Sequence, residues 1–302
     1  MIDVALPGTG GMMPLPDRGL SCLLLRIEGR MLLFDCGEGT QIGLKRLGTG
    51  FKPIDGIFLS HLHADHVSGL VGILLMLANS GREDPVRIFG PPGTSAVVAG
   101  QRLLARHLPY EAPVTELWPG ESIDIAGVAV TCAQAQHSTY CLAYRVDLDR
   151  RPRFDADRAR ALGIPVHTWR TLQQGESVEH AGRVFQPDEV LGPPRRGLAV
   201  AYVTDTRPTD ELARLARGVD LLVAEGTFGD PADQERALQT LHMTFAEAAG
   251  LAGRAGARQL LLTHFSPSLT DPLLYAQSAR DVFPETILGY DGLTLTLRFD
   301  DE

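Results

Sequence analysis

The feature that most constrains this fold is a six-residue run, His-Leu-His-Ala-Asp-His from His61 to His66, directly after the apolar stretch at residues 57–60. Neutral imidazole nitrogens and carboxylate oxygens are ligands of first-row metal ions, and alternating His61 and His63 leave a strand end on the same side. Asp65 and His66 are offset enough to serve a second ion. An exposed polar loop is the alternative, but four potential ligands within six positions, with distant partners, favour a metal site.

The chain has 302 residues, enough for one large domain or two and for a substantial buried core. The formal net charge of −9 argues against indiscriminate binding of nucleic acid by a basic surface. A local patch is compatible with that charge, and bound zinc ions would add positive charge where a polyanion reacts. Lys45 and Lys52 are the only lysines, so all other formal cations are arginines, which contact phosphate bidentately.

Cysteines and apolar stretches bear on the compartment. Cys22, Cys36, Cys132 and Cys141 are scattered, with no C-x-x-C pair, which favours small buried thiols in a reducing compartment over a disulfide framework. The N-terminus lacks a basic region followed by an apolar run, so we expect no secretory signal. The longest apolar stretch, around residues 69–78, is too short to span a bilayer. We therefore expect a cytoplasmic protein without a membrane partner.

Short β-like runs alternate with turns and helical segments along most of the chain. The β-like runs lie at residues 4–6, 23–27, 31–34, 54–59, 86–89, 123–125, 128–132, 198–203, 221–225 and 259–263. Helical segments are expected at residues 69–78, 96–107, 208–217 and 244–255. Candidate ligands recur at the carboxyl ends of the strands, with helices between them. This arrangement predicts sheets packed face to face and covered by helices outside.

The segment at residues 148–196 departs from this alternation. It contains five prolines and nine arginines, and nearby acids almost cancel the positive charge. A loop this long inside a compact domain is usually functional or disordered, so we interpret it as an inserted arm with a short helix near residues 155–162. A solvated linker without a partner is the alternative. We expect one domain over residues 1–302 with a flexible arm at residues 148–196.

Three further candidate ligands follow apolar strand-like runs. They are His137, Asp205 and His264. Each alone is a weak signal, because a lone histidine is more often structural and an aspartate after a strand is often a turn or cap. Together they repeat one arrangement, an apolar strand followed by a ligand, three times. The joint pattern indicates that all three belong with the histidine cluster.

A series of motifs extends over nearly the whole chain. In order, they are Gly8-Thr9-Gly10, Asp35-Cys36-Gly37-Glu38-Gly39-Thr40-Gln41, the His61–His66 block, His137, Asp205-Thr206-Arg207, Glu225-Gly226-Thr227-Phe228, His242 and His264-Phe265-Ser266. The set resembles metallo-β-lactamase-fold hydrolases, and most of all ribonuclease Z. The histidine block is typical of the whole superfamily. The D-C-G-E-G-T-Q run, the Glu-x-Thr-Phe element and the arm indicate ribonuclease Z in particular. The resemblance implies an α+β fold, a four-layer αββα sandwich with an inserted exosite-type arm.

The resemblance also implies two zinc ions per subunit and no organic cofactor. The ligands would be His61, His63 and His137 for the first ion, Asp65, His66 and His264 for the second, and Asp205 as a bridge. Each ion keeps an open position, and the pair can share a hydroxide that attacks a phosphodiester. Asp65 would also accept the proton of that water. The same ligands accept manganese or iron under a different supply.

A phosphodiester has a poor leaving group, and in the family a Glu–His pair supplies the acid. The matching residues here are Glu225 and His242. Glu225 would orient and charge the imidazole, and His242 would protonate the departing ribose 3′-oxygen. The alternatives are a buried glutamate at a strand end and a helix-capping histidine. Asp35 would brace the ligand loops by hydrogen bonding rather than bind metal.

The candidate RNA-binding residues depart from the family pattern. The arm of the family carries a Gly-Pro element and lysines, and the matching stretch here is residues 164–170. Arg158, Arg160 and Arg170 are expected to contact phosphates, whereas Trp169 either stacks on a base or packs the arm. The family loop P-x-K-x-R-N is Pro14-Leu15-Pro16-Asp17-Arg18-Gly19 here, which lacks the Lys and Asn but keeps Arg18.

We therefore expect a zinc-dependent endoribonuclease that removes the 3′ trailer from precursor tRNA, leaving a 3′-hydroxyl on the tRNA and a 5′-phosphate on the trailer. It would act as a homodimer in which the arm of one subunit holds the tRNA cut by the other. The alternative enzyme is a divergent phosphodiesterase or sulfatase of this fold acting on small esters. A non-catalytic RNA-binding scaffold is a third hypothesis, but lost ligands would be expected there, and all seven are present.

Overall fold

The structure is a computed structural model that describes residues 1–300. The chain forms two compact units, one made of residues 1–147 with the chain from residue 199 onward, and one made of Leu148–Leu198. We call the first unit the sandwich and the second unit the arm. Each unit has a hydrophobic core of its own.

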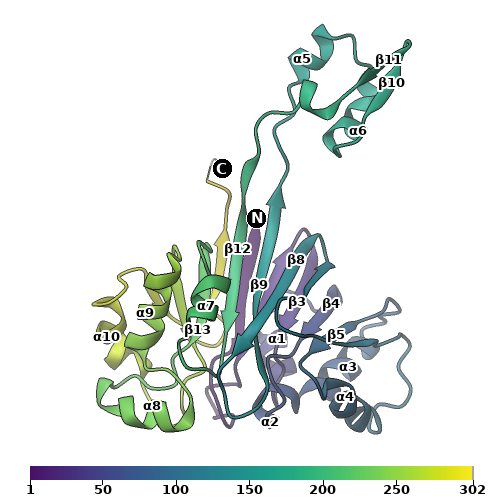
Figure 1. Ribbon diagram of the computed structural model, residues 1–302. Helices are drawn as coiled ribbons and strands as arrows, with labels where there is room; N and C mark the ends of the chain where they lie inside the picture. Colours follow the sequence, from purple (N-terminus) through teal and green to yellow (C-terminus); the bar gives the residue numbers. More distant parts are fainter. Residues whose placement is uncertain (301–302) are drawn as a thin grey trace. The chain divides into compact units, whose positions relative to one another are not determined.

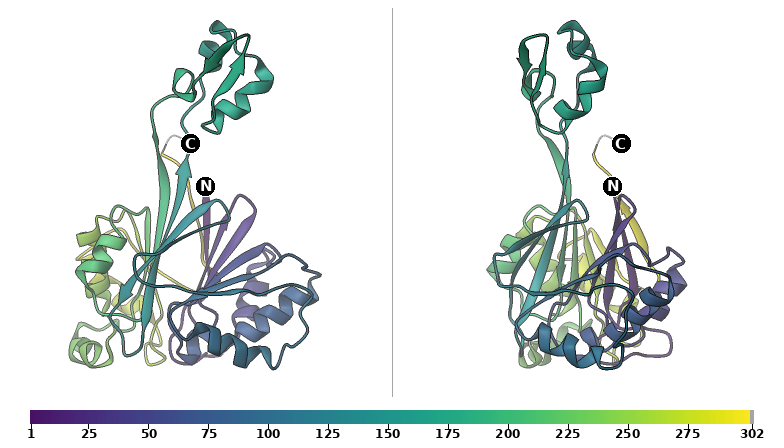
Figure 2. Two further views of the ribbon diagram at one scale, coloured as in Figure 1. Left: turned by 45° about the vertical axis from the view of Figure 1, so that its right-hand side comes forward. Right: turned by 90° about the vertical axis from the view of Figure 1, so that its right-hand side faces the viewer.

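The sandwich contains two seven-stranded sheets within residues 1–300 (Figures 1 and 2). The first has the order β16-β1-β2-β3-β4-β5-β6, with β1 (Ile2–Gly8), β2 (Cys22–Ile27), β3 (Arg30–Phe34), β4 (Ile54–Phe58), β5 (Arg87–Gly90), β6 (Val114–Glu116) and β16 (Thr294–Leu297). The second has the order β15-β14-β13-β12-β9-β8-β7, with β7 (Ser122–Ile125), β8 (Val128–Ala135), β9 (Cys141–Arg150), β12 (Arg195–Val203), β13 (Leu221–Glu225), β14 (Leu260–Thr263) and β15 (Thr286–Leu288).

Both sheets are mixed, and their parallel halves decide where the site forms. Strands β3 to β6 pair in parallel in the first sheet, and β12 to β15 pair in parallel in the second. The antiparallel β2–β3 hairpin turns through Glu28 and Gly29, whose φ angles of 50° and 82° are the left-handed pair that a two-residue hairpin turn favours. Because parallel strands end at the same edge, each sheet collects the residues that follow its strands in one place.

Helices cover the outer faces of the sheets (Figure 1). Those beside the first sheet are α1 (Thr40–Leu47), α3 (Leu70–Asn79) and α4 (Thr94–Arg102), and those beside the second are α7 (Asp210–Leu215), α9 (Phe245–Ala255) and α10 (Ala276–Arg280). Figure 1 draws two further helices, α2 (Ala64–Val67) and α8 (Gln234–Thr240), at the lower end of the sandwich. Helix α9 begins with a capping box of Thr244 and Glu247 and ends at Gly256 in the left-handed conformation. None of the helices within residues 1–300 combines the length and apolar character needed to cross a membrane.

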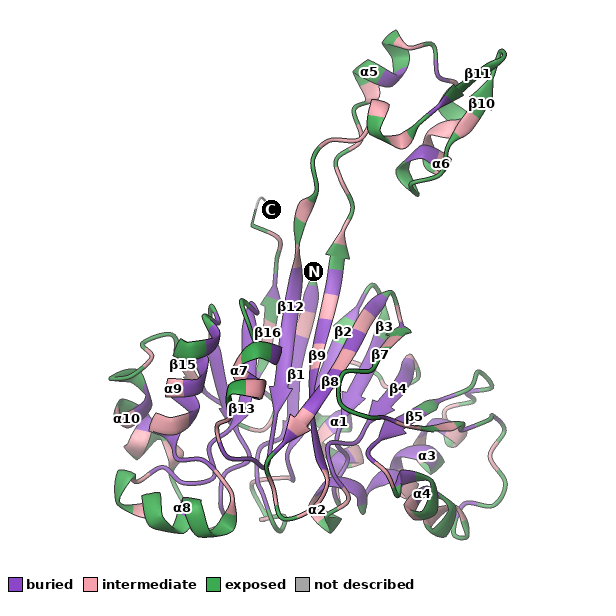
Figure 3. Cartoon of the chain, viewed as in Figure 1, coloured by how far each residue is buried: buried purple, intermediate pink, exposed green. Residues whose placement is uncertain are grey.

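Aromatic side chains hold the inner faces of the two sheets together. The ring of Phe34 on β3 lies 5.9 Å from that of Tyr202 on β12, and the ring of Phe58 on β4 lies 5.4 Å from that of Tyr144 on β9. The hydroxyl of Tyr144 donates a hydrogen bond to the carbonyl of Leu59 at 2.6 Å, so the ring is buried without an orphaned polar atom. Figure 3 shows the strands of the sandwich as mostly buried.

The arm is a small folded unit. It comprises α5 (Ala156–Ala161), η1 (Val166–Thr168), α6 (Trp169–Gln173), η2 (Pro187–Glu189) and the hairpin β10 (Val178–His180) and β11 (Arg183–Phe185). Its core contains the buried side chains of Ala159, Ile164, Leu172, Phe185 and Val190. A core this small leaves most of the arm surface to polar and charged residues.

The predicted fold class is confirmed: two mixed sheets pack face to face with helices outside. One local prediction is wrong. Strand β4 ends at Phe58, three residues before His61, and His63 is the N-cap residue that precedes the short helix α2, so the two histidines do not continue the strand. The sequence pattern also missed α1, α8, α10, β6, β15 and β16, which are short or lack a strong apolar period. It missed β9 as well, although this strand is ten residues long.

Candidate metal centre

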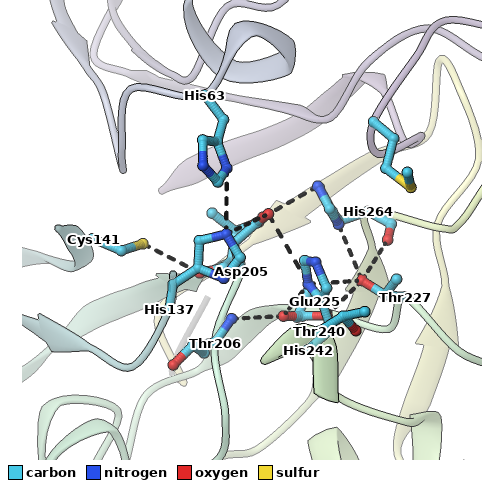
Figure 4. Close-up of polar contacts among 12 residues, drawn as sticks. His63, His137, Cys141, Asp205, Thr206, Glu225, Thr227, Thr240, His242 and His264 are labelled. Atoms are coloured by element: carbon cyan, nitrogen blue, oxygen red, sulfur yellow. Dashed lines mark hydrogen bonds and ion pairs between the residues drawn. The ribbon is translucent and has the colours of Figure 1, made fainter. Parts of the chain in front are cut away.

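Side chains that follow the strands of both sheets meet at one edge of the sandwich. His61 and His63 follow β4, His137 follows β8, Asp205 follows β12 and His264 follows β14. Figure 4 shows Asp205 among the side chains of His63, His137 and His264. The strand–ligand pattern in the sequence therefore arises because strands of both sheets end at the same edge of the sandwich.

Three residues that directly or closely follow strands at this edge adopt an unusual backbone conformation. Asp35, Asp205 and His264 have φ angles of 59°, 47° and 58°, a left-handed conformation that costs energy for residues other than glycine. Tight packing accompanies this strain. A Cβ atom at Gly11 would overlap the ring of His264, and one at Gly37 would overlap the carbonyl oxygen of Asp65. Glycine is thus required where the ligand loops approach one another.

The carboxylate of Asp205 lies between two groups of histidines. Its Oδ2 is 3.8 Å from Nε2 of His61 and 3.8 Å from Nε2 of His137. Its Oδ1 is 3.3 Å from Nε2 of His66 and 3.1 Å from Nε2 of His264. One carboxylate therefore presents a separate oxygen to each group, which is the arrangement a bridging ligand needs.

Two groups of three residues each have ligand atoms within 4.8 Å of one another: His61, His63 and His137, and Asp65, His66 and His264. The structure thus brings together all seven side chains that the sequence singled out as ligands. Asp65 Oδ2 lies 3.5 Å from Nε2 of His66 and 3.7 Å from Nε2 of His264 and accepts a hydrogen bond from the backbone N–H of Met12. Metal binding by these residues stays a prediction.

The histidine nitrogens provide a test of whether the site fits a metal ion. Nε2 of His61, His66 and His264 is buried without a hydrogen-bond partner among the described residues. On each of these rings the other nitrogen, Nδ1, has an oxygen partner. An Nδ1–H donor leaves a lone pair on Nε2, and a buried lone pair without a donor is costly unless a cation uses it. The donor set of imidazoles and carboxylates therefore fits divalent metal ions.

Charge and burial shift the protonation of these groups. Burial, together with the imidazole of His66, lowers the pKa of His61 well below its usual range. Burial alone would raise the pKa of Asp205, but His264, His66 and His61 outweigh it and lower that pKa well below its usual range. Burial would lower the pKa of His66, but the carboxylates of Asp205 and Asp35 outweigh it and raise that pKa well above its usual range.

A second polar cluster lies beside the ligands. Glu225, the last residue of β13, accepts hydrogen bonds at Oε1 from Nδ1 of His242 at 3.0 Å and from the backbone N–H of Thr206 at 2.6 Å. At Oε2 it accepts the hydroxyl of Thr227 at 2.6 Å. Burial would lower the pKa of His242, but the carboxylate of Glu225 raises it to about 9. The pair thus keeps a protonated imidazole near the ligands at neutral pH.

The predicted RNA-binding residues have different surroundings. Arg158, Arg160 and Arg170 are exposed on the arm. The indole of Trp169 instead packs against Phe154, with ring centroids 5.2 Å apart, and its N–H donates to the carbonyl of Ile164 at 3.0 Å.

Arg18 belongs to the sandwich, where its guanidinium donates to the carbonyls of Leu269 at 2.8 Å and Thr270 at 3.2 Å. It therefore ties its own loop to the segment that follows His264. RNA binding by Arg18 and by the arm residues stays a prediction.

The hydroxyls that support the ligands were not predicted from the sequence. Ser60 contacts Nδ1 of His61 and Thr227 contacts Nδ1 of His264, at 3.0 and 3.1 Å. Thr204 donates to Oδ1 of Asp205 at 2.7 Å. Each of the three stands directly before a ligand or inside a quoted motif, so position relative to the ligand was the available signal.

Comparisons with known proteins agree with this fold and site. Residues 30–182 and 144–265 match the family model described as beta-lactamase superfamily domain. Ribonuclease Z of Agathobacter rectalis is 44% identical over 303 residues, which cover 100% of both chains. Ribonuclease Z of Clostridium acetobutylicum is 41% identical over 308 residues, again covering 100% of both. The crystal structure of human tRNase Z, short form, aligns with a TM-score of 0.72 and 25% identity over 98% of this chain and 100% of that one.

The fold, the ligand cluster and the family model together define a protein of the β-lactamase superfamily. Within it, identities of 38–44% over 99–100% of this chain are found with proteins named ribonuclease Z. The chain belongs to the ribonuclease Z family, and the resemblance found in its motifs is confirmed.

Proposed function

We propose that this protein is a metal-dependent endoribonuclease that removes the 3′ trailer from precursor tRNA. The observation that carries the proposal is the position of Asp205, whose two oxygens face two separate sets of imidazole nitrogens. Membership of the ribonuclease Z family supports the substrate, because relatives of this length carry that name. The same geometry supports a centre that holds two cations rather than one.

The proposed cations are two zinc ions, with manganese or iron as substitutes. His61, His63 and His137 would hold the first, Asp65, His66 and His264 the second, and Asp205 both. When bound, such a pair supplies Lewis acidity and lowers the pKa of water so that it is nucleophilic at neutral pH.

The chain itself supplies a base and orientation for the attacking water. Asp65 is held by the N–H of Met12 at 2.7 Å, and its side chain is 12% exposed, so it faces the open side of the cluster. Burial would raise the pKa of Asp65, but the nearby imidazoles of His264 and His66 lower it well below its usual range, so it is ionised. We assign Asp65 as the acceptor of the proton that the attacking water releases.

His242 is the proposed acid. Glu225 binds its Nδ1–H, which leaves Nε2 as the atom that donates a proton to the departing ribose 3′-oxygen. The pKa of about 9 means that the imidazole carries this proton at neutral pH. Cleavage would leave a 3′-hydroxyl on the tRNA and a 5′-phosphate on the trailer, because the bond between phosphorus and the 3′-oxygen is the one that breaks.

The proposal also includes how the tRNA is bound, the oligomeric state and the cellular compartment. Exposed Arg158, Arg160 and Arg170 would contact tRNA phosphates, and the enzyme would act as a homodimer in which one arm holds the tRNA cut by the other subunit. Four buried free thiols, Cys22, Cys36, Cys132 and Cys141, suit the reducing cytoplasm. The alternative function, hydrolysis of small phosphodiesters or sulfate esters, uses the same centre without the arm.

One experiment separates these functions. Purified protein is analysed for metal content and then incubated with a precursor tRNA carrying a 3′ trailer, with cleavage ends mapped at nucleotide resolution. We expect two metal ions per chain and a single cut that leaves a 3′-hydroxyl. Turnover of small chromogenic diesters alone, with the precursor tRNA intact, would replace the leading proposal with the alternative. The dimer is tested by the molar mass in solution from light scattering.

A further inference from the structure

Two buried hydroxyl groups lie between a carboxylate and a histidine at the candidate metal centre. They belong to Ser60, which directly precedes His61, and to Thr227, which lies in the Glu-Gly-Thr-Phe motif. Ser60 is 0% exposed and Thr227 is 3% exposed, so neither hydroxyl exchanges its partners for bulk water. The chemistry proposed above gives neither residue a role.

The direction of the hydrogen bonds at Ser60 follows from Asp35. Oδ2 of Asp35 lies 2.8 Å from Nδ1 of His66 and 3.0 Å from the hydroxyl of Tyr202, and Oδ1 accepts the backbone N–H of Ser60 at 2.7 Å. A carboxylate only accepts, so the hydroxyl of Ser60, 2.8 Å from Oδ2, donates its proton there. Its oxygen is then left to accept from Nδ1 of His61, 3.0 Å away.

The same pattern recurs at Thr227 in the other half of the site. Its hydroxyl donates to Oε2 of Glu225 at 2.6 Å, and its oxygen lies 3.1 Å from Nδ1 of His264. Glu225 also accepts from Nδ1 of His242. Each buried carboxylate therefore orients one histidine directly and a second histidine through one hydroxyl: Asp35 orients His66 and His61, and Glu225 orients His242 and His264.

The tautomers that result are those a metal ion requires. With the proton held on Nδ1, the lone pair of each ring lies on Nε2, and these Nε2 atoms of His61 and His264 are buried without a partner among the described residues. His61 belongs to the first group of ligands and His264 to the second. At each proposed cation, one hydroxyl thus connects a buried carboxylate to a ligand histidine. We call this carboxylate–hydroxyl–histidine arrangement a hydroxyl relay.

We propose that Ser60 and Thr227 are positioning residues that fix the ligand tautomer of His61 and His264, one for each metal position. The inference rests on the proposed dinuclear centre. Thr227 has a further consequence, because it connects a metal ligand, His264, to the carboxylate that holds the leaving-group acid, His242. Loss of this hydroxyl disturbs both groups at once, whereas loss of the Ser60 hydroxyl disturbs only ligands.

The test compares metal affinity in matched variants. Thr227→Val keeps the shape of the side chain and removes only the hydroxyl, Thr227→Ser restores it, and Ser60→Ala removes the other relay. The control is Thr94→Val, which deletes an equally buried hydroxyl, 0% exposed, that donates only to the carbonyl of Pro91. Zinc per chain is measured against a graded chelator, and cobalt substitution reports the coordination spectrum of each position.

We expect Thr227→Val and Ser60→Ala each to weaken one of the two zinc equivalents by about 10- to 100-fold. Thr227→Ser and Thr94→Val should bind both within a few-fold of wild type. Retention of both equivalents at wild-type affinity in Thr227→Val and Ser60→Ala overturns the relay proposal. A wild-type protein that binds no metal overturns the proposed function instead, so the two failures are distinguishable.

A measurement on the unaltered protein covers the case in which a variant does not fold. The nitrogen chemical shifts of the imidazoles, recorded by NMR on the zinc-loaded wild type, identify which ring nitrogen carries the proton. We expect His61 and His264 to be protonated on Nδ1. Protonation of either ring on Nε2, with Nδ1 bound to metal, contradicts the relay without any substitution.

Discussion

The metal end of the sandwich and the arm differ in how their functional side chains are held. Asp205 is 3% exposed and lies among four imidazole nitrogens, and Glu225 is fully buried with four donors on its carboxylate. Arg160 on the arm is exposed and pairs with its sequence neighbour Asp157, itself 94% exposed at the side chain. Chemistry needs side chains fixed within fractions of an ångström, whereas phosphate binding needs positive charge and reach.

This contrast predicts where substitutions are tolerated. A buried polar network costs most when one member is removed, because its partners are left without hydrogen bonds in a low-dielectric interior. An exposed ion pair on the arm contributes roughly 0–1 kcal/mol, so its loss changes little in the folded state. Substitutions should therefore have their largest effects at the metal centre and their smallest on the arm.

The largest effect is expected for Asp205→Ala. The substitution removes the oxygens that face both histidine groups, so we expect loss of bound metal and a fall in cleavage of at least about 10³-fold. Metal analysis and single-turnover cleavage measure this. Asp210→Ala, an exposed acid at the start of α7, is the matched control and should behave as wild type. Two ions per chain in Asp205→Ala would show that the carboxylate is no ligand.

His242→Ala should separate metal binding from proton donation. Because no nitrogen of His242 is among the proposed ligands, both ions should remain, while cleavage of RNA falls by roughly 10²- to 10⁴-fold. A diester with a nitrophenolate leaving group needs no acid, so its hydrolysis should fall far less. Equal losses on both substrates would remove His242 from the role of acid, and so would RNA cleavage near the wild-type rate.

The two regions also differ in how well the sequence predicted them. The ligands were predictable because His61, His63, Asp65 and His66 form one dense cluster in the sequence. Asp205 and His264 each follow an apolar strand, and these strands belong to one parallel set that ends at one edge. The hydroxyls of Ser60 and Thr227 were not predictable, because serine and threonine are common along the chain and only the folded backbone shows which hydroxyls contact a ligand imidazole. Helix α1 was missed since its inner face buries only Thr40 and Leu44.

Removal of the arm tests whether its role is confined to the substrate. The clusters of buried side chains that pack the helices against each sheet of the sandwich contain no residue of Leu148–Leu198. Replacing residues 151–195 with a short Gly-Ser linker should therefore leave the sandwich folded and its metal content unchanged. Hydrolysis of a small chromogenic diester should stay within a few-fold of wild type. Affinity for precursor tRNA should fall by roughly 10²-fold, as expected when several phosphates are no longer neutralised by arginine. A parallel loss on the small diester would mean that the arm also serves the metal centre.

The arginines of the arm should account for part of that loss. In the triple variant Arg158→Gln, Arg160→Gln and Arg170→Gln, tRNA affinity should fall by about 10-fold, and the slope of its logarithm against the logarithm of salt should decrease by about one for each phosphate that these arginines neutralise. Filter binding across a salt series measures both. Arg106→Gln, an exposed arginine of the sandwich, is the control for net charge. An unchanged slope would assign phosphate binding to other residues.

The smallest effect distinguishes two roles for Trp169. Its ring packs on Phe154, its N–H is satisfied by Ile164, and Arg160 lies 5.4 Å above the ring, so its faces are already in use. Trp169→Phe keeps most of this packing, and tRNA affinity should change by no more than about twofold, whereas a residue that stacks on a base contributes about 1–3 kcal/mol when truncated. Trp169→Ala should loosen the arm core and expose it to protease before it weakens binding. Weaker tRNA binding in Trp169→Phe, with the arm still protease-resistant, would instead assign the indole to a base.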